Sequence, residues 1–154
     1  MEKRYFTLEQ VNDQVARLME SFARVMQVRA QLKTLYRRLE ERGFAPSSED
    51  FPIVVKGAPK DVNRDRATFK ALIEYLREEI QRVQETGCMI KDVEVGLVDW
   101  FSQKDGRDIL LCWRFGEKEV SFWHDPDTGY EGRRPISELL SEGGRPRTGN
   151  DSFQ

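Results

Sequence analysis

Residue types that usually carry chemistry are scarce in this sequence. It contains only two cysteines, Cys88 and Cys112, and one histidine, His124. So few cysteines exclude a disulfide framework, and the chain has no C-x-x-C or H-x-x-x-H spacing for a zinc site. We therefore expect no cofactor and no metal, and free thiols fit a reducing compartment.

Long apolar runs are also missing. No stretch approaches the ~20 apolar residues that a membrane-spanning helix needs. The opening residues, MEKRYFTLEQ, lack the apolar core of a signal peptide. The sequence accordingly predicts a cytoplasmic protein without a membrane partner.

No excess of positive charge marks the chain as a nucleic-acid binder. The formal net charge is −2, from 25 Lys/Arg and 27 Asp/Glu. Residues 1–42 carry nine Lys/Arg and six Asp/Glu, whereas residues 87–154 carry nine and thirteen. Proteins that bind nucleic acid usually show a basic footprint, which is absent at the level of whole segments. A nucleic-acid partner is therefore not expected.

What the sequence has in quantity is charge and helical periodicity. Charged residues make up 34% of the chain and hydrophobic residues 38%, as is typical of long solvated helices. Thr7 and Gln10 match a T-x-x-Q capping box, and Gly43 is a stop signal. Between them, heptad spacing of apolar residues predicts a coiled-coil helix over about 7–42. The two columns of this repeat are Leu8, Val15, Phe22, Arg29 and Tyr36, and Val11, Leu18, Val25, Leu32 and Leu39.

A second helix is predicted over about 62–86, after a loop over 43–61 that is rich in proline, glycine and serine. An isolated helix of this length needs a partner for its apolar stripe, so we expect an antiparallel hairpin arm over residues 1–86. Arg29 and Arg66 interrupt the apolar columns. They either set the register against a carboxylate across the pair or line a polar site within the arm.

The first helix carries more apolar surface than the second can cover. The additional residues are Met19, Met26, Val28 and Leu35. Such a surplus needs a covering surface, because a solvated helix normally exposes a polar face. The C-terminal module, a second copy of the chain and an outside partner are the three candidates.

Residues 87–140 change from helical to strand periodicity. β-branched and aromatic segments, separated by the turn signals QKDGRD and FGEK, predict a three-stranded antiparallel β-meander. A turn-rich loop and a short helix over 136–140 follow, and residues 141–154 have the composition of a flexible tail. The predicted fold class is therefore α+β: a long antiparallel α-helical hairpin followed by a small three-stranded antiparallel β-meander.

Five short segments of the chain form a distinctive set of motifs: YFTLEQ at 5–10, GLVDW at 96–100, KDGRDILLCWRFGE at 104–117, WH at 123–124 and GYEGRRP at 129–135. Together they resemble the domain of unknown function 2203 family over nearly the whole chain. The resemblance implies a small, mostly prokaryotic protein with an N-terminal coiled coil. It brings no established activity with it.

Basic and aromatic side chains gather in the predicted strands and in the loop that follows them. Arginine beside tryptophan can hold a planar anion or a partner's carboxylate by bidentate hydrogen bonding and stacking. The same residues equally suit an internal network, with the tryptophans as a small core and Arg114 paired with Asp99 or Glu117. The candidate ligand- or partner-binding residues are Arg107, Trp113, Arg114, Glu117, Trp123, His124 and Arg133.

A catalytic pair is the weaker hypothesis. Cys112 and His124 lie on adjacent predicted strands and could meet as nucleophile and base, with Asp99 or Asp125 orienting the imidazole. Against this, a cysteine between a leucine and a tryptophan in a strand is usually a buried core residue. The chain offers no complete catalytic set, so an enzyme is not favoured.

Two functions remain open at this point. The favoured one is a protein-interaction or oligomerising module, which binds a second copy or another protein through the helical arm. The alternative is a small-ligand module, anion-binding or enzymatic, built on the arginine, tryptophan and histidine cluster.

Overall fold

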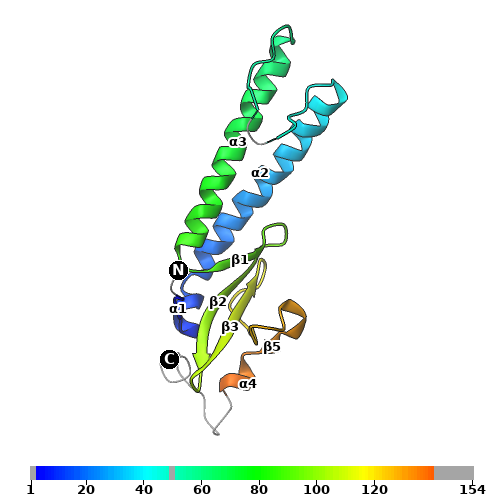
Figure 1. Cartoon of the computed structure of the whole chain (residues 1–154). Coiled ribbons are helices and arrows are strands. Elements are labelled where there is room, and N and C mark those ends of the chain that lie inside the picture. The colour runs from blue at the N-terminus through cyan, green and yellow to red at the C-terminus, as the bar shows by residue number, and fades with distance from the viewer. Residues whose placement is uncertain (1–2, 49–50, 141–154) are drawn as a thin grey trace. The chain divides into compact units, whose positions relative to one another are not determined.

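The structure is a computed structural model that describes residues 3–48 and 51–140 (Figure 1). The predicted tail at 141–154 lies outside the described residues. The elements in chain order are α1 (Leu8–Asn12), α2 (Val15–Glu41), α3 (Lys60–Glu85), β1 (Met89–Asp92), β2 (Leu97–Lys104), β3 (Arg107–Arg114), β4 (Phe122–His124), the 3₁₀ helix η1 (Tyr130–Gly132), β5 (Arg134–Pro135) and α4 (Ser137–Leu140).

These elements form two compact units. The sheet unit combines the described residues up to Phe22 with those from Val83 onward, and the helical unit is Ala23–Arg82. The sheet unit therefore contains α1, the first turns of α2 and the last residues of α3 together with every strand. Each unit has its own interior.

The first predicted helix begins as expected but is not continuous. Thr7 caps α1: its hydroxyl accepts from the Gln10 amide at 3.1 Å, and its own amide donates to the Gln10 side chain at 2.9 Å. The single helix predicted over 7–42 is nevertheless wrong, because α1 ends at Asn12 and α2 begins at Val15. Polar side chains at the break bond elsewhere in the sheet unit, since Asn12 accepts from the Val120 amide at 2.7 Å and Gln14 accepts from the Trp100 indole at 3.3 Å.

The helical unit is an antiparallel pair of helices. The ion pairs that join them include Arg24 to Glu79 at 2.7 Å, Arg38 to Asp65 at 2.8 Å and Arg42 to Asp61 at 2.6 Å. The partner number falls along α3 as it rises along α2, which is the signature of antiparallel helices. The α2 side of the interior consists of buried apolar residues: Val25, Val28, Leu32, Leu35 and Leu39.

Arg66 holds the connecting loop against α3. Its guanidinium donates to the backbone carbonyls of Phe44 at 2.5 Å, Pro52 at 2.6 Å and Ile53 at 3.3 Å. The side chain is buried and also lies over the Phe51 ring, 5.1 Å from the ring centroid. Neither sequence-based interpretation of Arg66 anticipated this role, because the acceptors are main-chain atoms of the loop.

The predicted three-stranded meander is wrong in strand number. The described residues form a five-stranded sheet in the order β1-β2-β3-β4-β5, with every neighbouring pair antiparallel. The segment predicted as one first strand is two, because the Asp92 carboxylate accepts from the amides of Glu94 and Val95 and closes a turn that ends at Gly96 with φ 74°. The fifth strand comes from the predicted loop, where Pro135 is tolerated at the sheet edge.

Strand register assigns the side chains to two faces of the sheet. Leu111 lies opposite both Trp100 and Trp123, and Cys112 lies opposite Asp99 and Phe122. One face is an apolar core, against which Phe22 of α2 packs with its ring centroid 6.2 Å from that of Trp113. The core residues of this face are Val98, Trp100, Ile109, Leu111, Trp113 and Trp123. The opposite face carries a polar cluster of Asp99, Cys112 and His124.

Candidate functional site

Three side chains of the types that serve in catalysis or metal binding meet on the second face of the sheet. Asp99 of β2 is directly opposite Cys112 of β3, and His124 of β4 is opposite Leu110, two residues before Cys112. One carboxylate oxygen of Asp99, the sulfur of Cys112 and one ring nitrogen of His124 all lie within 4.8 Å of one another. The residues are 2%, 0% and 2% exposed respectively. The weak catalytic candidates from the sequence are thus brought together, but in the interior of the sheet unit.

Hydrogen bonds fix the protonation of the His124 ring. Nδ1 is 2.8 Å from the Asp125 carbonyl oxygen, and Nε2 is 3.0 Å from Oδ2 of Asp99. A carbonyl oxygen can only accept, so Nδ1 carries a proton, and Nε2 shares a second proton with the carboxylate. Burial by itself lowers the pKa of His124, but the bonds to Asp99 and Asp125 outweigh it, and the net shift is upward.

Cys112 has the properties of an unreactive thiol. Burial is the largest cause that raises its pKa, and the neighbouring Asp99 carboxylate raises it further. Nucleophilic catalysis needs the thiolate and an approach for the substrate. This geometry disfavours a cysteine nucleophile, because the thiol stays protonated and His124 already directs both nitrogens to other acceptors.

One oxygen of the cluster is left without a partner. Oδ1 of Asp99 is buried and makes no hydrogen bond to any described residue. An unsatisfied carboxylate oxygen in the interior is costly, since its desolvation is not compensated. The cluster therefore contains a buried carboxylate oxygen that no hydrogen bond to the described part of the chain satisfies.

A layer of arginine and aromatic side chains lies beside this cluster. Arg133 donates to Glu117 at 2.5 Å and lies over the rings of Phe122 and Tyr130, 3.9 Å and 4.7 Å from their centroids. Arg114 donates to the Tyr130 hydroxyl at 3.2 Å. The Arg133 side chain is only 8% exposed. Its charge is thus largely balanced by Glu117 rather than offered to a ligand.

The seven candidate binding residues do not form one site. Arg114 and His124 belong to the side of the sheet that carries Cys112, whereas Trp113 and Trp123 are on the apolar core face. Arg133 lies over the ring of Phe122 and bonds to Glu117, which places both near the Cys112 side. Trp113 donates its indole N–H to the Glu117 carbonyl at 2.8 Å, and Arg107 pairs with Asp125. The face alternation of β3 was predictable, but the pairing of β4 with β3 was needed to separate the tryptophans from the histidine.

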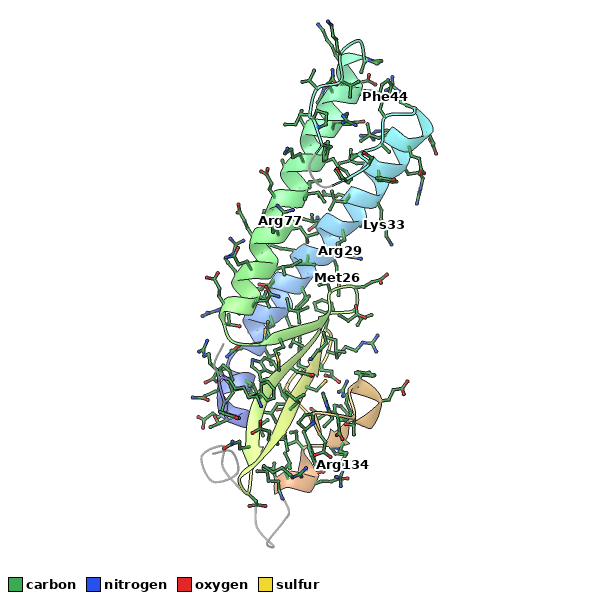
Figure 2. The ribbon with its side chains drawn as sticks, in the orientation of Figure 1. Met26, Arg29, Lys33, Phe44, Arg77 and Arg134 are labelled. Atoms are coloured by element: carbon green, nitrogen blue, oxygen red, sulfur yellow. The ribbon has the colours of Figure 1, made fainter. Side chains whose placement is uncertain are left out.

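The sheet unit also has a polar hollow. It encloses about 310 Å³ and is lined by Lys104, Asp105, Arg107, Trp123, Arg134, Glu138 and Leu139. Arg134, labelled in Figure 2, lies over the Trp123 ring at 4.9 Å and pairs with Glu138 at 2.7 Å. The predicted candidates Arg107 and Trp123 thus line this hollow instead of the cluster around His124.

The helical unit has a groove that sequence reasoning did not single out. It encloses about 390 Å³ and is lined by Leu32, Lys33, Tyr36, Arg37, Glu40 and Phe69. Arg29, one turn before Lys33, continues the same edge of α2, and Figure 2 shows Met26, Arg29 and Lys33 in succession along that helix. The signal available from sequence was the four-residue spacing of Arg29, Lys33 and Arg37, which places three cations on one side of a helix.

These features define the class of protein: an α+β chain with a two-helix unit and a five-stranded antiparallel sheet. The chain belongs to the family described as "Uncharacterized conserved protein (DUF2203)", whose sequence profile matches residues 4–136. No curated protein and no solved structure matches the chain. Within the described residues, the helices are too polar or too short to cross a membrane.

Proposed function

We propose that this protein is an interaction module whose groove on the helical unit binds an amphipathic helix with acidic flanks from a partner protein. The observation that carries the proposal is the groove of the helical unit, where apolar side chains of both helices lie beside the unpaired cations Lys33 and Arg37 of α2. Helix-in-groove recognition combines these two elements, since the apolar face gives affinity and the flanking charges give orientation.

The apolar row belongs to α3. Its members are Phe69, Leu72, Ile73, Leu76 and Ile80, whose spacing places them on one side of the helix. All five are only partly buried, in contrast to the buried residues of α2 that face the interior. Tyr36 adds an aromatic ring that is 40% exposed, with its centroid 6.3 Å from that of Phe69. Aromatic side chains of this kind are common anchors at protein interfaces.

The cationic row belongs to α2. Arg29, Lys33 and Arg37 recur every four residues, and no hydrogen bond or ion pair to a described residue engages any of the three side chains. Residues 23–42 contain six Lys/Arg and two Asp/Glu. The charges that pair with α3 come from other positions, Arg24, Arg38 and Arg42. Three cations therefore remain for an acidic ligand.

Charge favours a partner helix over a second copy of this chain. Two copies that met groove to groove would bring both cationic rows into one interface, and like charges across an interface oppose association. Acidic residues on the flanks of a partner helix remove that repulsion. A nucleic acid would satisfy the cations but would leave the apolar row uncovered.

The test uses two synthetic amphipathic peptides with identical leucine and isoleucine faces. One carries glutamates on both flanks of that face, and the other carries lysines. Fluorescence anisotropy with the full chain should show that the glutamate peptide binds at least tenfold more tightly, and the double variant Lys33→Glu, Arg37→Glu should reverse this preference. Tyr36→Ala should weaken the glutamate peptide by about tenfold.

Matched controls separate the groove from general electrostatics. Arg64→Glu makes one such charge reversal on α3 outside the groove, and Tyr75→Ala removes a tyrosine that is 36% exposed but does not line it. Both should bind the glutamate peptide like the unchanged protein. Equal affinity for the two peptides would contradict the proposal. So would a stable dimer by light scattering that neither peptide disrupts.

A further inference from the structure

The polar cluster on the sheet has the composition of a metal site. Asp99, Cys112 and His124 supply one carboxylate oxygen, one sulfur and one imidazole nitrogen from three adjacent strands. Their burial excludes bulk water, and the rigid neighbours β2, β3 and β4 fix their positions. We propose that Asp99, Cys112 and His124 bind one divalent metal ion of the zinc class.

The spacing of the donor atoms suits such an ion. Zinc lies about 2.3 Å from thiolate sulfur and about 2.0 Å from imidazole nitrogen or carboxylate oxygen, so tetrahedral donors are roughly 3.5 Å apart. The atoms here lie within 4.8 Å of one another, with Nε2 of His124 already 3.0 Å from Oδ2 of Asp99. The widest separation therefore exceeds the tetrahedral value by about 1.3 Å at most, which is the distance that side-chain rotation has to close.

The surroundings of the histidine are those of a metal ligand. Nδ1 donates to the Asp125 carbonyl, so Nε2 is the nitrogen bonded to Asp99. Metal-bound histidines usually donate their other ring N–H to a carbonyl or carboxylate, which fixes both tautomer and ring orientation. The Asp125 carbonyl provides this second bond without any rearrangement.

Charge and hydrogen bonding favour a cation at this place. Arg133 and Glu117 balance each other, so the Asp99 carboxylate and a Cys112 thiolate leave two negative charges for a divalent ion to neutralise. The ion displaces the thiol proton and the proton shared by His124 and Asp99, as metal binding to these groups requires. It also gives the unpartnered Oδ1 of Asp99 a positive neighbour.

The donor types select the metal. Thiolate and imidazole favour zinc over magnesium or calcium, which prefer an all-oxygen site. Three protein ligands leave one coordination position for water. Because the cluster is buried, the ion would join β2, β3 and β4 and stabilise the sheet rather than meet a substrate.

Cobalt provides the test, since a thiolate bound to Co²⁺ gives a charge-transfer band in the near ultraviolet. The full chain, stripped with a chelator and titrated with Co²⁺, should develop this band at one ion per chain and lose it when Zn²⁺ is added. Cys112→Ser should abolish the band. Cys88→Ser is the matched control, because it removes the other buried thiol, and it should leave the band unchanged.

Asp99→Asn, which keeps the size of the side chain, should weaken Zn²⁺ binding in a chelator competition by tenfold or more. If circular dichroism shows that Cys112→Ser is unfolded, the zinc affinity of Asp99→Asn is the test of the metal site. Absence of the band in the unchanged protein, or its survival in Cys112→Ser, would overturn the proposal. Zinc affinity that does not change in a folded Asp99→Asn would also overturn it.

Discussion

Burial decides what the two thiols of this chain can do. Cys88 is 5% exposed, and burial raises its pKa to about 11, although a hydrogen bond with Thr86 opposes the shift. The pKa of Cys112 is raised as well, through burial first and the Asp99 carboxylate second. A raised thiol pKa means that the thiolate forms only at high pH, so at neutral pH both groups are protonated.

We therefore expect neither cysteine of the metal-free native protein to react quickly with an aromatic disulfide reagent at neutral pH. In denaturant both should react at the rate of a free thiol, because exposure returns the pKa to its ordinary value. Absorbance of the released thiolate measures both rates. If one thiol per chain reacted rapidly in the native protein, and this reaction were lost in Cys112→Ser, then Cys112 would be accessible and the expectation would be wrong.

Arg66 is a second residue whose environment determines its role. It supplies hydrogen bonds to three loop carbonyls from a position that is 5% exposed. Hydrogen bonds that involve a charged donor contribute more than neutral ones, and the loss leaves buried acceptors unsatisfied. Arg66→Ala should lower the free energy of unfolding by about 3 kcal/mol.

Urea denaturation followed by circular dichroism measures this loss. Arg64→Ala, an exposed arginine two residues away, should change stability by less than about 0.5 kcal/mol. If the two variants were equally stable, the bonds from Arg66 would have no net effect on folding.

At the scale of the element, the start of α1 shows local sequence and structure in agreement. Thr7 and Gln10 satisfy each other's backbone amides without help from the rest of the chain. Because the two residues bond to each other, the T-x-x-Q motif alone was enough to predict the capping box. The end of α1 could not be predicted, because the side chains of Asn12 and Gln14 bond to residues about a hundred positions away.

Thr7→Ala removes the hydroxyl that accepts from the Gln10 amide and should cost about 1 kcal/mol of stability. Thr34→Ala is the control, since Thr34 lies within α2, where alanine is the better helix former. Thermal unfolding of both variants gives the comparison. A Thr7 variant as stable as the unchanged protein would mean that the cap is replaced by water.

Some features of the strands likewise follow from local sequence, and others depend on residues elsewhere in the chain or on turns. Alternation within β3 was enough to place Cys112 and Trp113 on opposite faces. Neither β5 nor the break between β1 and β2 could be predicted, because the first is two residues long and the second depends on the turn at Asp92. The groove was missed because cations four residues apart are usual on any solvated helix.

At the scale of the whole molecule, the two units differ in how completely they cover their apolar residues. Most of the β3 side chains from Ile109 to Trp113 are 0% exposed, whereas the apolar row of α3 is only partly buried. Local opening is easier where fewer apolar contacts must be broken. The sheet and the middle of α3 should therefore differ in protection.

Hydrogen exchange followed by mass spectrometry should find the slowest amides in β2 and β3 and faster exchange in the middle of α3. Addition of the glutamate peptide should slow exchange in α3 and leave β3 unchanged. Uniform protection of both units would indicate that they unfold together, which would contradict this expectation.

The bonds from Arg66 have one more consequence, which concerns tolerance to change. They end on carbonyl oxygens, and every residue type provides the same carbonyl. The hydrogen bonds that position the loop are thus donated by α3, and the loop's own side chains contribute the buried Phe51 ring. Substitutions at Pro52 or Ile53 can change the side chains on the surface of the loop while Arg66 still binds its carbonyls. The surface of this segment can therefore vary while its backbone keeps the same path.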